Sequence, residues 1–215
     1  MRRMLAPDFC VVCRTFPGKR RFSFLCDDCL SKIKPIVSID LTIAGSEQKS
    51  RTAVRVFALS HYRDPLKSLI RAKNHGNILA ARQLGILMGH LLPIMSLECD
   101  CLVPVPLHPT RYARRGFNQS KVIATVLGAL LNKPVIDCLK KTRRTTFQAQ
   151  LNADARKENT RNAFRLTGKA ELLKNKHVVI VDDLMTTGAT LSAVGKELRV
   201  ARPASLKAYV ACRAV

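Results

Sequence analysis

Residues 177–190 read HVVIVDDLMTTGAT, in which an unbroken apolar run leads to two carboxylates, a hydroxyl-rich turn and a predicted helix. An apolar run of this kind, from His177 to Val181, is typical of a strand buried on both faces of a parallel sheet. Ligands of such sheets bind beyond the carboxyl ends of the strands. The position of the acids and hydroxyls therefore predicts a ligand site at that edge of the sheet.

The hydroxyl-rich turn has the chemistry of a phosphate site. The helix predicted from about Ala189 to Val200 presents unpaired N–H groups and the positive end of its dipole to an anion. Gly188 leaves room for the backbone to close on that anion. We assign the phosphate contacts to Met185, Thr186, Thr187, Gly188, Ala189 and Thr190. The residue types alone also fit a simpler interpretation, in which the turn only caps the helix.

The two acids before the turn need a different partner, because carboxylates repel a phosphate. Asp182 and Asp183 are suited to accept hydrogen bonds from vicinal ribose hydroxyls. They are equally suited to hold Mg²⁺ through water. The stretch therefore predicts a ligand that carries both a ribose and a phosphate.

The rest of the chain alternates strand and helix patterns. Strands are predicted over about 52–60, 101–107, 133–139, 177–181 and 205–212, and helices over about 65–75, 77–92, 117–131 and 189–200. This order predicts an α/β fold with a mostly parallel sheet flanked by helices. We divide the chain into a cysteine-bearing module at 1–35, a linker at 36–50 and the α/β domain at 51–215.

The charge balance suggests a polyanionic partner. The 37 Lys and Arg residues against 15 Asp and Glu residues give a formal net charge of +22. Such an excess favours nucleic acid or an anionic membrane surface as partner, although a generally basic proteome would also produce it. The absence of Trp and the aromatic content of 5% argue against an extended base-stacking platform.

Targeting signals are not evident in the sequence. No apolar run reaches membrane-spanning length, and the basic residues after Met1 are not followed by an apolar segment of the signal-peptide type. We therefore expect the protein in the cytoplasm, where thiols stay reduced.

The first thirty residues hold four cysteines as two Cys-x-x-Cys pairs. Thiolates of Cys10, Cys13, Cys26 and Cys29 at this spacing favour one tetrahedral, structural Zn²⁺ site, and a redox role is the alternative. A module this short cannot bury enough core to fold alone, so the metal would supply folding energy. Its basic residues are candidate DNA contacts: Arg14, Lys19, Arg20 and Arg21.

The phosphate loop resembles the motif with which type I phosphoribosyltransferases bind phosphoribosyl pyrophosphate (PRPP). The shared pattern is an apolar strand, two acids, two variable positions and Thr-Thr-Gly-x-Thr, which runs here from Val178 to Thr190. The resemblance implies a type I phosphoribosyltransferase-like fold, PRPP as the ligand and Mg²⁺ as its companion.

Other segments resemble one branch of that superfamily, the ComF proteins of bacterial competence. They are residues 102–108 (LVPVPLH), 114–119 (RRGFNQ), 148–151 (QAQL) and the cysteine module, so the resemblance covers nearly the whole chain. It implies a PRPP-binding, zinc-fingered protein that acts on incoming single-stranded DNA in natural transformation. It also implies DNA-uptake proteins as partners, through which the chain would associate peripherally with the inner membrane.

The same resemblance gives roles to basic loops. The loop after the strand that holds Val105 corresponds to the region that contacts pyrophosphate, and the stretch from Arg143 to Arg161 corresponds to a flexible loop that closes over PRPP. Guanidinium groups match phosphate oxygens bidentately. The candidates for pyrophosphate or DNA phosphate are Val105, Arg114, Arg115, Arg143 and Arg144. A solvated basic loop is the alternative for each.

The catalytic question stays open at this stage. Phosphoribosyl transfer needs no nucleophilic side chain, because the departing pyrophosphate is stabilised by Mg²⁺ and cations, and the motifs specify no acceptor. The first hypothesis is a ComF-type protein of DNA uptake. The alternative is a metabolic phosphoribosyltransferase that moves ribose 5-phosphate onto a base or amine, and a third reading is a regulator that senses PRPP without turning it over.

Overall fold

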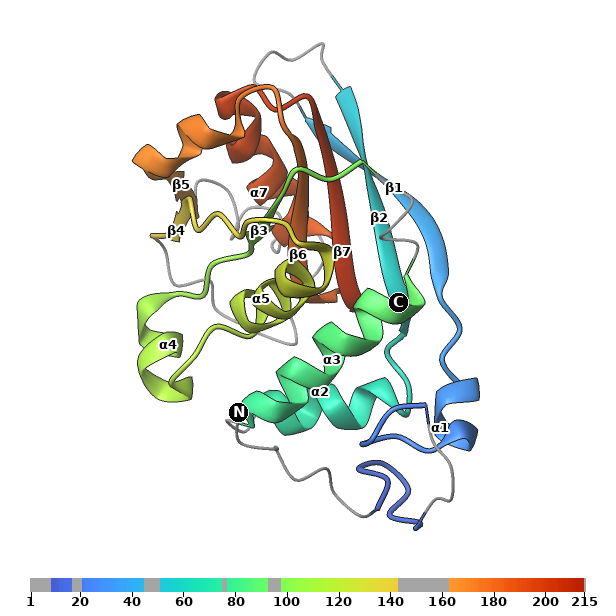
Figure 1. Ribbon diagram of the computed structural model, residues 1–215. Helices are drawn as coiled ribbons and strands as arrows, with labels where there is room; N and C mark the ends of the chain where they lie inside the picture. Colours follow the sequence, from blue (N-terminus) through green and yellow to red (C-terminus); the bar gives the residue numbers. More distant parts are fainter. Residues whose placement is uncertain are drawn as a thin grey trace.

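A computed structural model of the chain describes residues 9–16, 21–44, 51–74, 77–92, 98–142 and 163–214 (Figure 1). The main sheet among these residues has the strand order β1-β2-β7-β6-β3. Its strands are β1 (Ile36–Ala44), β2 (Arg51–His61), β3 (Cys101–Pro104), β6 (His177–Met185) and β7 (Ser205–Arg213). β1 is antiparallel to β2, while the pairs β2–β7, β7–β6 and β6–β3 are parallel. The predicted α/β fold with a mostly parallel sheet is confirmed.

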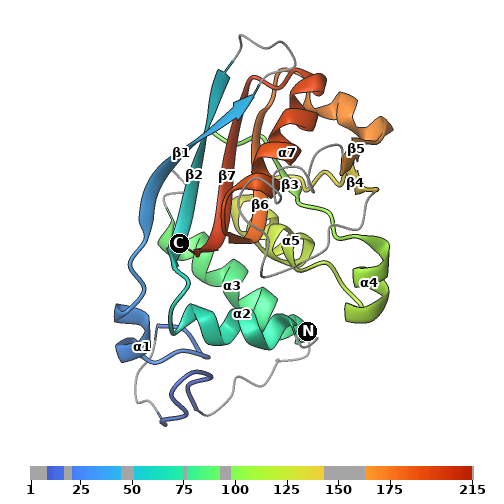
Figure 2. The same ribbon diagram turned by 180° about the vertical axis from the view of Figure 1, so that it is seen from behind.

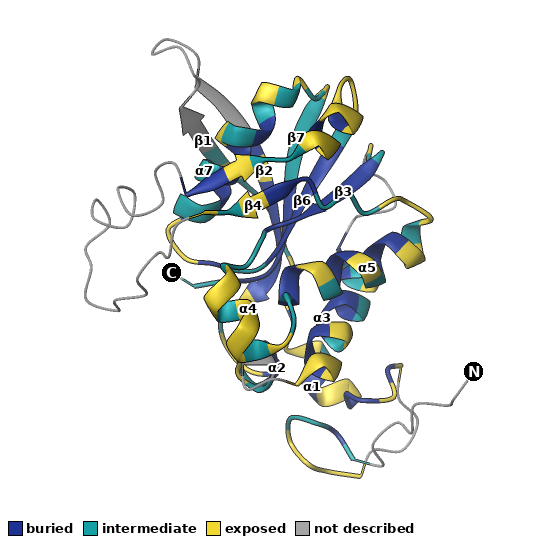
Figure 3. Cartoon of the chain, turned by 90° about the vertical axis from the view of Figure 1, so that its left-hand side faces the viewer, coloured by how far each residue is buried: buried dark blue, intermediate teal, exposed yellow. Residues whose placement is uncertain are grey.

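The apolar run in β6 is explained by helices that cover both faces of the sheet. Val179 and Val181 belong to one buried cluster, and Val178 and Ile180 belong to another on the opposite face. Helices α2 (Leu66–Asn74), α3 (Ile78–Leu91) and α5 (Gln119–Leu131) cover the first face, and α7 (Ala189–Leu198) covers the second (Figures 1 and 2). Alternate residues of one strand thus enter two cores. Figure 3 shows the central strands as mostly buried between exposed helical surfaces.

The linker predicted at 36–50 is corrected in its first part. Residues 36–44 form strand β1, which pairs with β2 so that Leu41 lies opposite Val54. Ile39 and Leu41 alternate with polar Asp40 and pack against the core shared with α7. That alternation is a strand pattern, but an irregularity in the pairing between Ile36 and Ile39 interrupts it, so the sequence there also resembles a linker. Residues 45–50 lie outside the described part of the chain.

Three further elements, helix α4 and strands β4 and β5, follow β3 in the chain. Helix α4 (Pro109–Arg115), which the sequence analysis did not predict, follows the β3 loop. The strand expected over 133–139 is reduced to a bridge between Leu102 and Val135, and strand β4 (Leu139–Lys141) starts where it was expected to end. β4 pairs antiparallel with β5 (Phe164–Leu166). Two short 3-10 helices, η2 (Gly168–Leu173) and η3 (Arg199–Ala201), complete the described elements.

The cysteine-bearing module packs against the α/β domain. Its described part contains helix α1 (Asp27–Ser31), and its buried residues, including Phe24, Leu25 and Ile33, belong to the same core cluster as α2 and α3. The rings of Phe22 and His90 lie 5.6 Å apart in an edge-on contact between the module and α3. Within the described ranges, no helix has both the length and the apolar character needed to cross a membrane.

Candidate functional site

The acid pair lies inside β6 rather than after its end. Leu184 and Met185 still pair with β7, so the strand continues beyond the acids on that side. On the other side, β3 ends at Pro104, which pairs with Val181. Asp182 and Asp183 therefore follow the last rung of the β3–β6 ladder, at the carboxyl edge where parallel sheets bind ligands.

Asp182 is held in place from helix α5. It is 8% exposed, and its carboxylate accepts hydrogen bonds from the Ser120 hydroxyl at 2.8 Å and from the Asp183 N–H at 2.9 Å. Ser120 sits in the first turn of α5, where the helix dipole also favours a carboxylate. Asp183 is half-buried. The site thus combines one carboxylate fixed by its neighbours with a second that is nearer the surface.

The start of α5 is ordered by Asn118, the residue that caps it. Its side-chain oxygen accepts from the Ser120 N–H at 3.1 Å, and its side-chain nitrogen donates to the Val105 carbonyl at 3.0 Å. The Val105 N–H in turn donates to the Val181 carbonyl at 3.0 Å. The only hydrogen-bond donor of buried Val105 is therefore engaged within the protein and does not point to an anion. Val105 instead joins the β3 loop to β6 and α5.

The phosphate loop ends in an uncapped helix. Gly188 has a φ of +78° and begins α7, and no side chain caps the N-terminus of that helix. The first helical hydrogen bond runs from the Ser192 N–H to the Gly188 carbonyl at 2.8 Å, so the N–H groups before Ser192 precede the helical ladder. Thr186 and Thr187 are exposed beside them. This arrangement offers backbone and hydroxyl donors to an anion.

The predicted phosphate contacts divide by burial. Thr186 and Thr187 are exposed, and Ala189 and Thr190 are half-buried, so these four surround the buried Gly188. The Met185 side chain is 5% exposed and packs in the core, and its carbonyl accepts from the Ala214 N–H at 2.8 Å. Met185 can therefore contribute no side-chain contact to a phosphate.

The predicted basic candidates fall into three groups. Arg114 and Arg115 lie in the last turn of α4, the first exposed and the second half-buried. In the cysteine module, the guanidinium groups of Arg14 and Arg21 lie 5.1 Å and 5.7 Å from the ring centroids of neighbouring phenylalanines. The other four candidates, Lys19, Arg20, Arg143 and Arg144, lie outside the described residues.

Lys141 is a site residue that the sequence analysis missed. Burial, aided by the positive charge of Arg111, lowers the pKa of Lys141 to about 8, against the opposing effect of the Asp182 carboxylate. Its ammonium also lies 5.3 Å from the ring centroid of Phe164. The sequence shows only one more lysine in a basic stretch, whereas the β4–β5 ladder buries this one within reach of the charge of Asp182.

The four cysteines converge on one point. Their Sγ atoms all lie within 4.8 Å of one another, and the Cys13–Cys26 pair is 3.6 Å apart. A tetrahedral ion with bonds of ~2.3 Å would separate its sulfur ligands by ~3.8 Å, so the geometry fits a metal. The Thr15 hydroxyl lowers the pKa of Cys13 to about 6, whereas burial raises the pKa of Cys29. Four thiolates would leave no coordination position for a substrate.

Comparison with known proteins identifies the family. Residues 113–214 match the phosphoribosyl transferase domain. DNA utilization protein YhgH of Salmonella typhi is 30% identical over 231 aligned positions, which cover 98% of this chain and 99% of that protein. Competence protein F of Haemophilus influenzae is 31% identical over 152 residues, covering 67% of this chain and 66% of the relative. The chain belongs to the ComF family.

The two ComF-family comparisons differ in extent. The match to competence protein F spans just under two thirds of that relative, whereas the match to YhgH includes the cysteine module. The domain match begins inside α4 and contains the acid pair and the phosphate loop. Among solved structures, a purine phosphoribosyltransferase from Pyrococcus horikoshii Ot3 is similar at 17% identity and a TM-score of 0.37, covering 62% of this chain and 84% of that chain.

Proposed function

We propose that this ComF-family protein binds PRPP at the carboxyl edge of β6. The observation that carries the proposal is the placement of a carboxylate pair, of which Asp182 is fixed by Ser120, a short loop before an uncapped helix N-terminus. Asp182 and Asp183 would receive the ribose hydroxyls, and residues 186–190 would receive the 5′-phosphate. The phosphoribosyl transferase domain match spans both parts.

Magnesium would lie at the acid pair, and pyrophosphate would lie toward the end of α4. Carboxylate oxygens are the ligand type that Mg²⁺ prefers, and Asp182 and Asp183 fit it through intervening water. Arg114 and Arg115, in the last turn of α4, remain candidates for the pyrophosphate oxygens.

Calorimetric titration with PRPP in the presence of Mg²⁺ tests this assignment. We expect saturable binding of PRPP and much weaker binding of ribose 5-phosphate, which lacks the pyrophosphate. Equal affinities for the two ligands would remove the pyrophosphate part of the proposal. Undetectable binding of both would remove the whole of it.

We also propose a structural Zn²⁺ held by Cys10, Cys13, Cys26 and Cys29 as the core of a module at 1–35. The mutual approach of the four sulfur atoms supports this, as does the burial of three of them. The remaining residues would form a PRPP-binding domain at 51–215, to which β1 adds a strand. Zinc would supply folding energy rather than chemistry.

The cellular role we propose is the handling of single-stranded DNA during uptake into the cytoplasm. The net charge of +22 supports a polyanionic partner, and the relatives carry the names competence protein F and DNA utilization protein YhgH. DNA-uptake proteins would then be its partners, and any contact with the inner membrane would be peripheral. Titration of PRPP with and without single-stranded DNA tests the link, because a coupled site changes the affinity of the other.

The domain match also favours a second candidate function. A phosphoribosyl transferase domain would move ribose 5-phosphate from PRPP to a base or amine. Release of pyrophosphate by the purified protein, assayed across bases, amines and DNA, distinguishes the two. Release above background with a base or an amine favours the metabolic enzyme, whereas binding without release favours a PRPP-dependent DNA-handling protein.

A further inference from the structure

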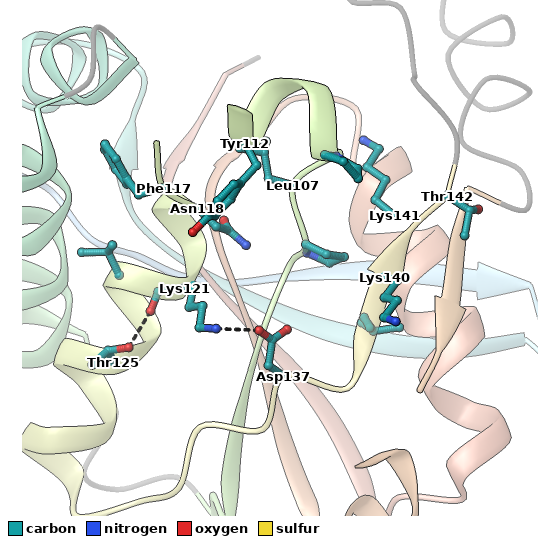
Figure 4. Close-up of a pocket in the computed structure, with 14 residues that line it drawn as sticks. Leu107, Tyr112, Phe117, Asn118, Lys121, Thr125, Asp137, Lys140, Lys141 and Thr142 are labelled. Carbon is teal, nitrogen blue, oxygen red and sulfur yellow. Dashed lines mark hydrogen bonds and ion pairs between the residues drawn. The ribbon is translucent and has the colours of Figure 1, made fainter. Parts of the chain in front are cut away.

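A pocket of 730 Å³ lies between α4, α5 and β4 (Figure 4). None of the described residues 182–190 lines it, so its lining is distinct from the acid pair and the phosphate loop, and Lys141 is the lining residue that interacts with the charge of Asp182. Its volume is within the range of sites that bind small organic ligands. The pocket is therefore a cavity of ligand size in addition to the proposed PRPP site.

One side of the pocket is apolar and aromatic. Tyr112 of α4 is 52% exposed, and with Phe117 and Leu107 it forms the wall on the α4 and α5 side (Figure 4). Helix α4 buries none of its residues, so this exposed tyrosine has no role in the described core. A flat aromatic ligand can stack on such a ring.

The opposite side of the pocket is cationic. Lys140 and Lys141 of β4, and Thr142 directly after the strand, line it across from the aromatic wall (Figure 4). Asp137 is the only carboxylate among the described lining residues, and it pairs with Lys121 at 2.8 Å. The ammonium groups of Lys140 and Lys141 thus lack a carboxylate partner in the lining.

The desolvated ammonium of Lys141 strengthens this side of the pocket. Burial lowers the pKa of Lys141 to about 8, so its charge is held in surroundings where water screens it poorly. Such a charge gains more from an anionic ligand than a fully solvated one does. Lys140 is exposed and extends the positive surface toward solvent.

The aromatic and the cationic side of the pocket together indicate which class of ligand fits it. A purely apolar molecule would offer no anion to the ammonium groups, and inorganic phosphate would leave the aromatic wall uncovered. We propose that this pocket binds a nucleotide, with its base stacked on Tyr112 and its phosphate held by Lys140 and Lys141. The Lys121–Asp137 pair at the floor of the pocket offers a hydrogen-bond donor and an acceptor to the edge of the nucleobase (Figure 4).

A free nucleotide and one unit of single-stranded DNA share this chemistry. The second source rests on the proposed DNA-handling function, whereas the first does not. Thymidine monophosphate and a fluorescent oligothymidylate are the probes that separate them. Tighter binding of the oligonucleotide assigns the pocket to a strand, and equal binding assigns it to a free nucleotide.

The test compares both probes on Tyr112→Ala, Tyr112→Phe and Lys140→Gln. We expect Tyr112→Ala to weaken binding about tenfold and Tyr112→Phe to retain it, because stacking needs the ring and not the hydroxyl. Lys140→Gln should reduce the slope of the logarithm of oligonucleotide affinity against the logarithm of salt concentration by about one, the value of one lost phosphate contact. Val200→Ala and Lys196→Gln are matched controls, since they truncate an exposed apolar residue and neutralise an exposed lysine on other elements.

Two results would overturn the nucleotide pocket. If the wild-type protein binds oligothymidylate and both Tyr112→Ala and Lys140→Gln bind as the controls do, the pocket is wrong while the DNA-handling function stands. If PRPP competes with thymidine monophosphate for one site, the cavity belongs to the PRPP site. Binding of thymidine monophosphate that depends on Tyr112, with no binding of single-stranded DNA, supports the pocket and removes the DNA function.

Discussion

The Ser120 hydroxyl donates a hydrogen bond of 2.8 Å to the Asp182 carboxylate, which joins the first turn of α5 to the middle of β6. Both residues are buried, so the bond is shielded from competing water. It fixes one carboxylate of the acid pair before any ligand arrives. Fixed groups of this kind reduce the entropy that a ligand must lose on binding.

Removal of that hydroxyl is therefore expected to affect both stability and PRPP binding. Ser120→Ala leaves a buried carboxylate with one fewer donor and should lower the free energy of unfolding by about 1–3 kcal/mol. PRPP affinity should fall about tenfold, because Asp182 loses its fixed orientation. Urea unfolding and calorimetry measure the two effects, with exposed Ser31→Ala as the control. Unchanged PRPP affinity in Ser120→Ala would contradict a positioning role.

Substitution of three glycines by alanine distinguishes the cost of backbone strain from the cost of steric overlap. A Cβ on Gly188 would lie 2.6 Å from a Leu41 methyl at a φ of +78°, whereas Gly116 has the same φ with open space around it. Gly168 has neither restriction. We expect Gly188→Ala to destabilise most, Gly116→Ala to cost about 1 kcal/mol and Gly168→Ala to be nearly neutral. Thermal unfolding measures the stability of the three variants. An equal loss of stability in Gly188→Ala and Gly116→Ala would show that the Leu41 side chain moves aside at no cost.

The position of Leu41 gives a second test of the phosphate loop. Leu41→Ala should recover part of the stability lost in Gly188→Ala, because it removes the side chain that the new Cβ meets. The strain of a positive φ would remain, so recovery should be incomplete. A double-mutant cycle measures the coupling, and full additivity of the two changes would mean that the loop moves away from β1.

Metal removal should unfold the cysteine module. We expect one zinc per chain by mass spectrometry of metals, and loss of that zinc in Cys26→Ser but not in Cys99→Ser, which lies outside the cluster. Chelation should lower the melting temperature, because metal binding supplies folding energy to so short a module. A protein that keeps its melting temperature after complete removal of zinc would show that the packing against α2 and α3 is sufficient.

Lys141 predicts a specific dependence of stability on pH. Its pKa falls from 10.5 to about 8 on folding, so the folded state binds fewer protons than the unfolded state between those values. Burial of the charged lysine therefore lowers the stability of the folded state below pH 8, and this destabilisation is relieved as the pH rises to 10.5. Lys141→Met should reduce the gain in stability between pH 7 and about 10, as measured by urea unfolding. An identical gain in wild type and variant would place the lysine in solvent.

The main features of the fold and of the candidate site were predictable because they depend on local patterns. The apolar run before Asp182 indicated a strand covered on both faces, and the glycine before α7 indicated a tight turn at a helix start. The spacing of the two Cys-x-x-Cys pairs indicated that four thiols converge, which the structure confirms. Each of these signals lies within a few residues of the feature it specifies.

The features that were missed depend on tertiary pairing. Lys141 differs from its neighbours because the β4–β5 ladder buries it, within reach of the charge of Asp182. Val105 looked available for an anion, and its N–H is engaged by Val181 on an adjacent strand. The alternation in β1 was visible in the sequence, but its function as a wall behind Gly188 follows only from the packing of Leu41.

Calorimetric titration of PRPP into the wild-type protein and into an Asp182→Asn plus Asp183→Asn variant tests the central claim most directly. Asn keeps the size of each side chain and removes its charge, and Asp28→Asn on α1 is the matched control. We expect the double variant to lose at least about tenfold in affinity, because neutral amides accept weaker hydrogen bonds from ribose hydroxyls and attract Mg²⁺ poorly. Wild-type affinity in the double variant would contradict a PRPP site at this edge of the sheet.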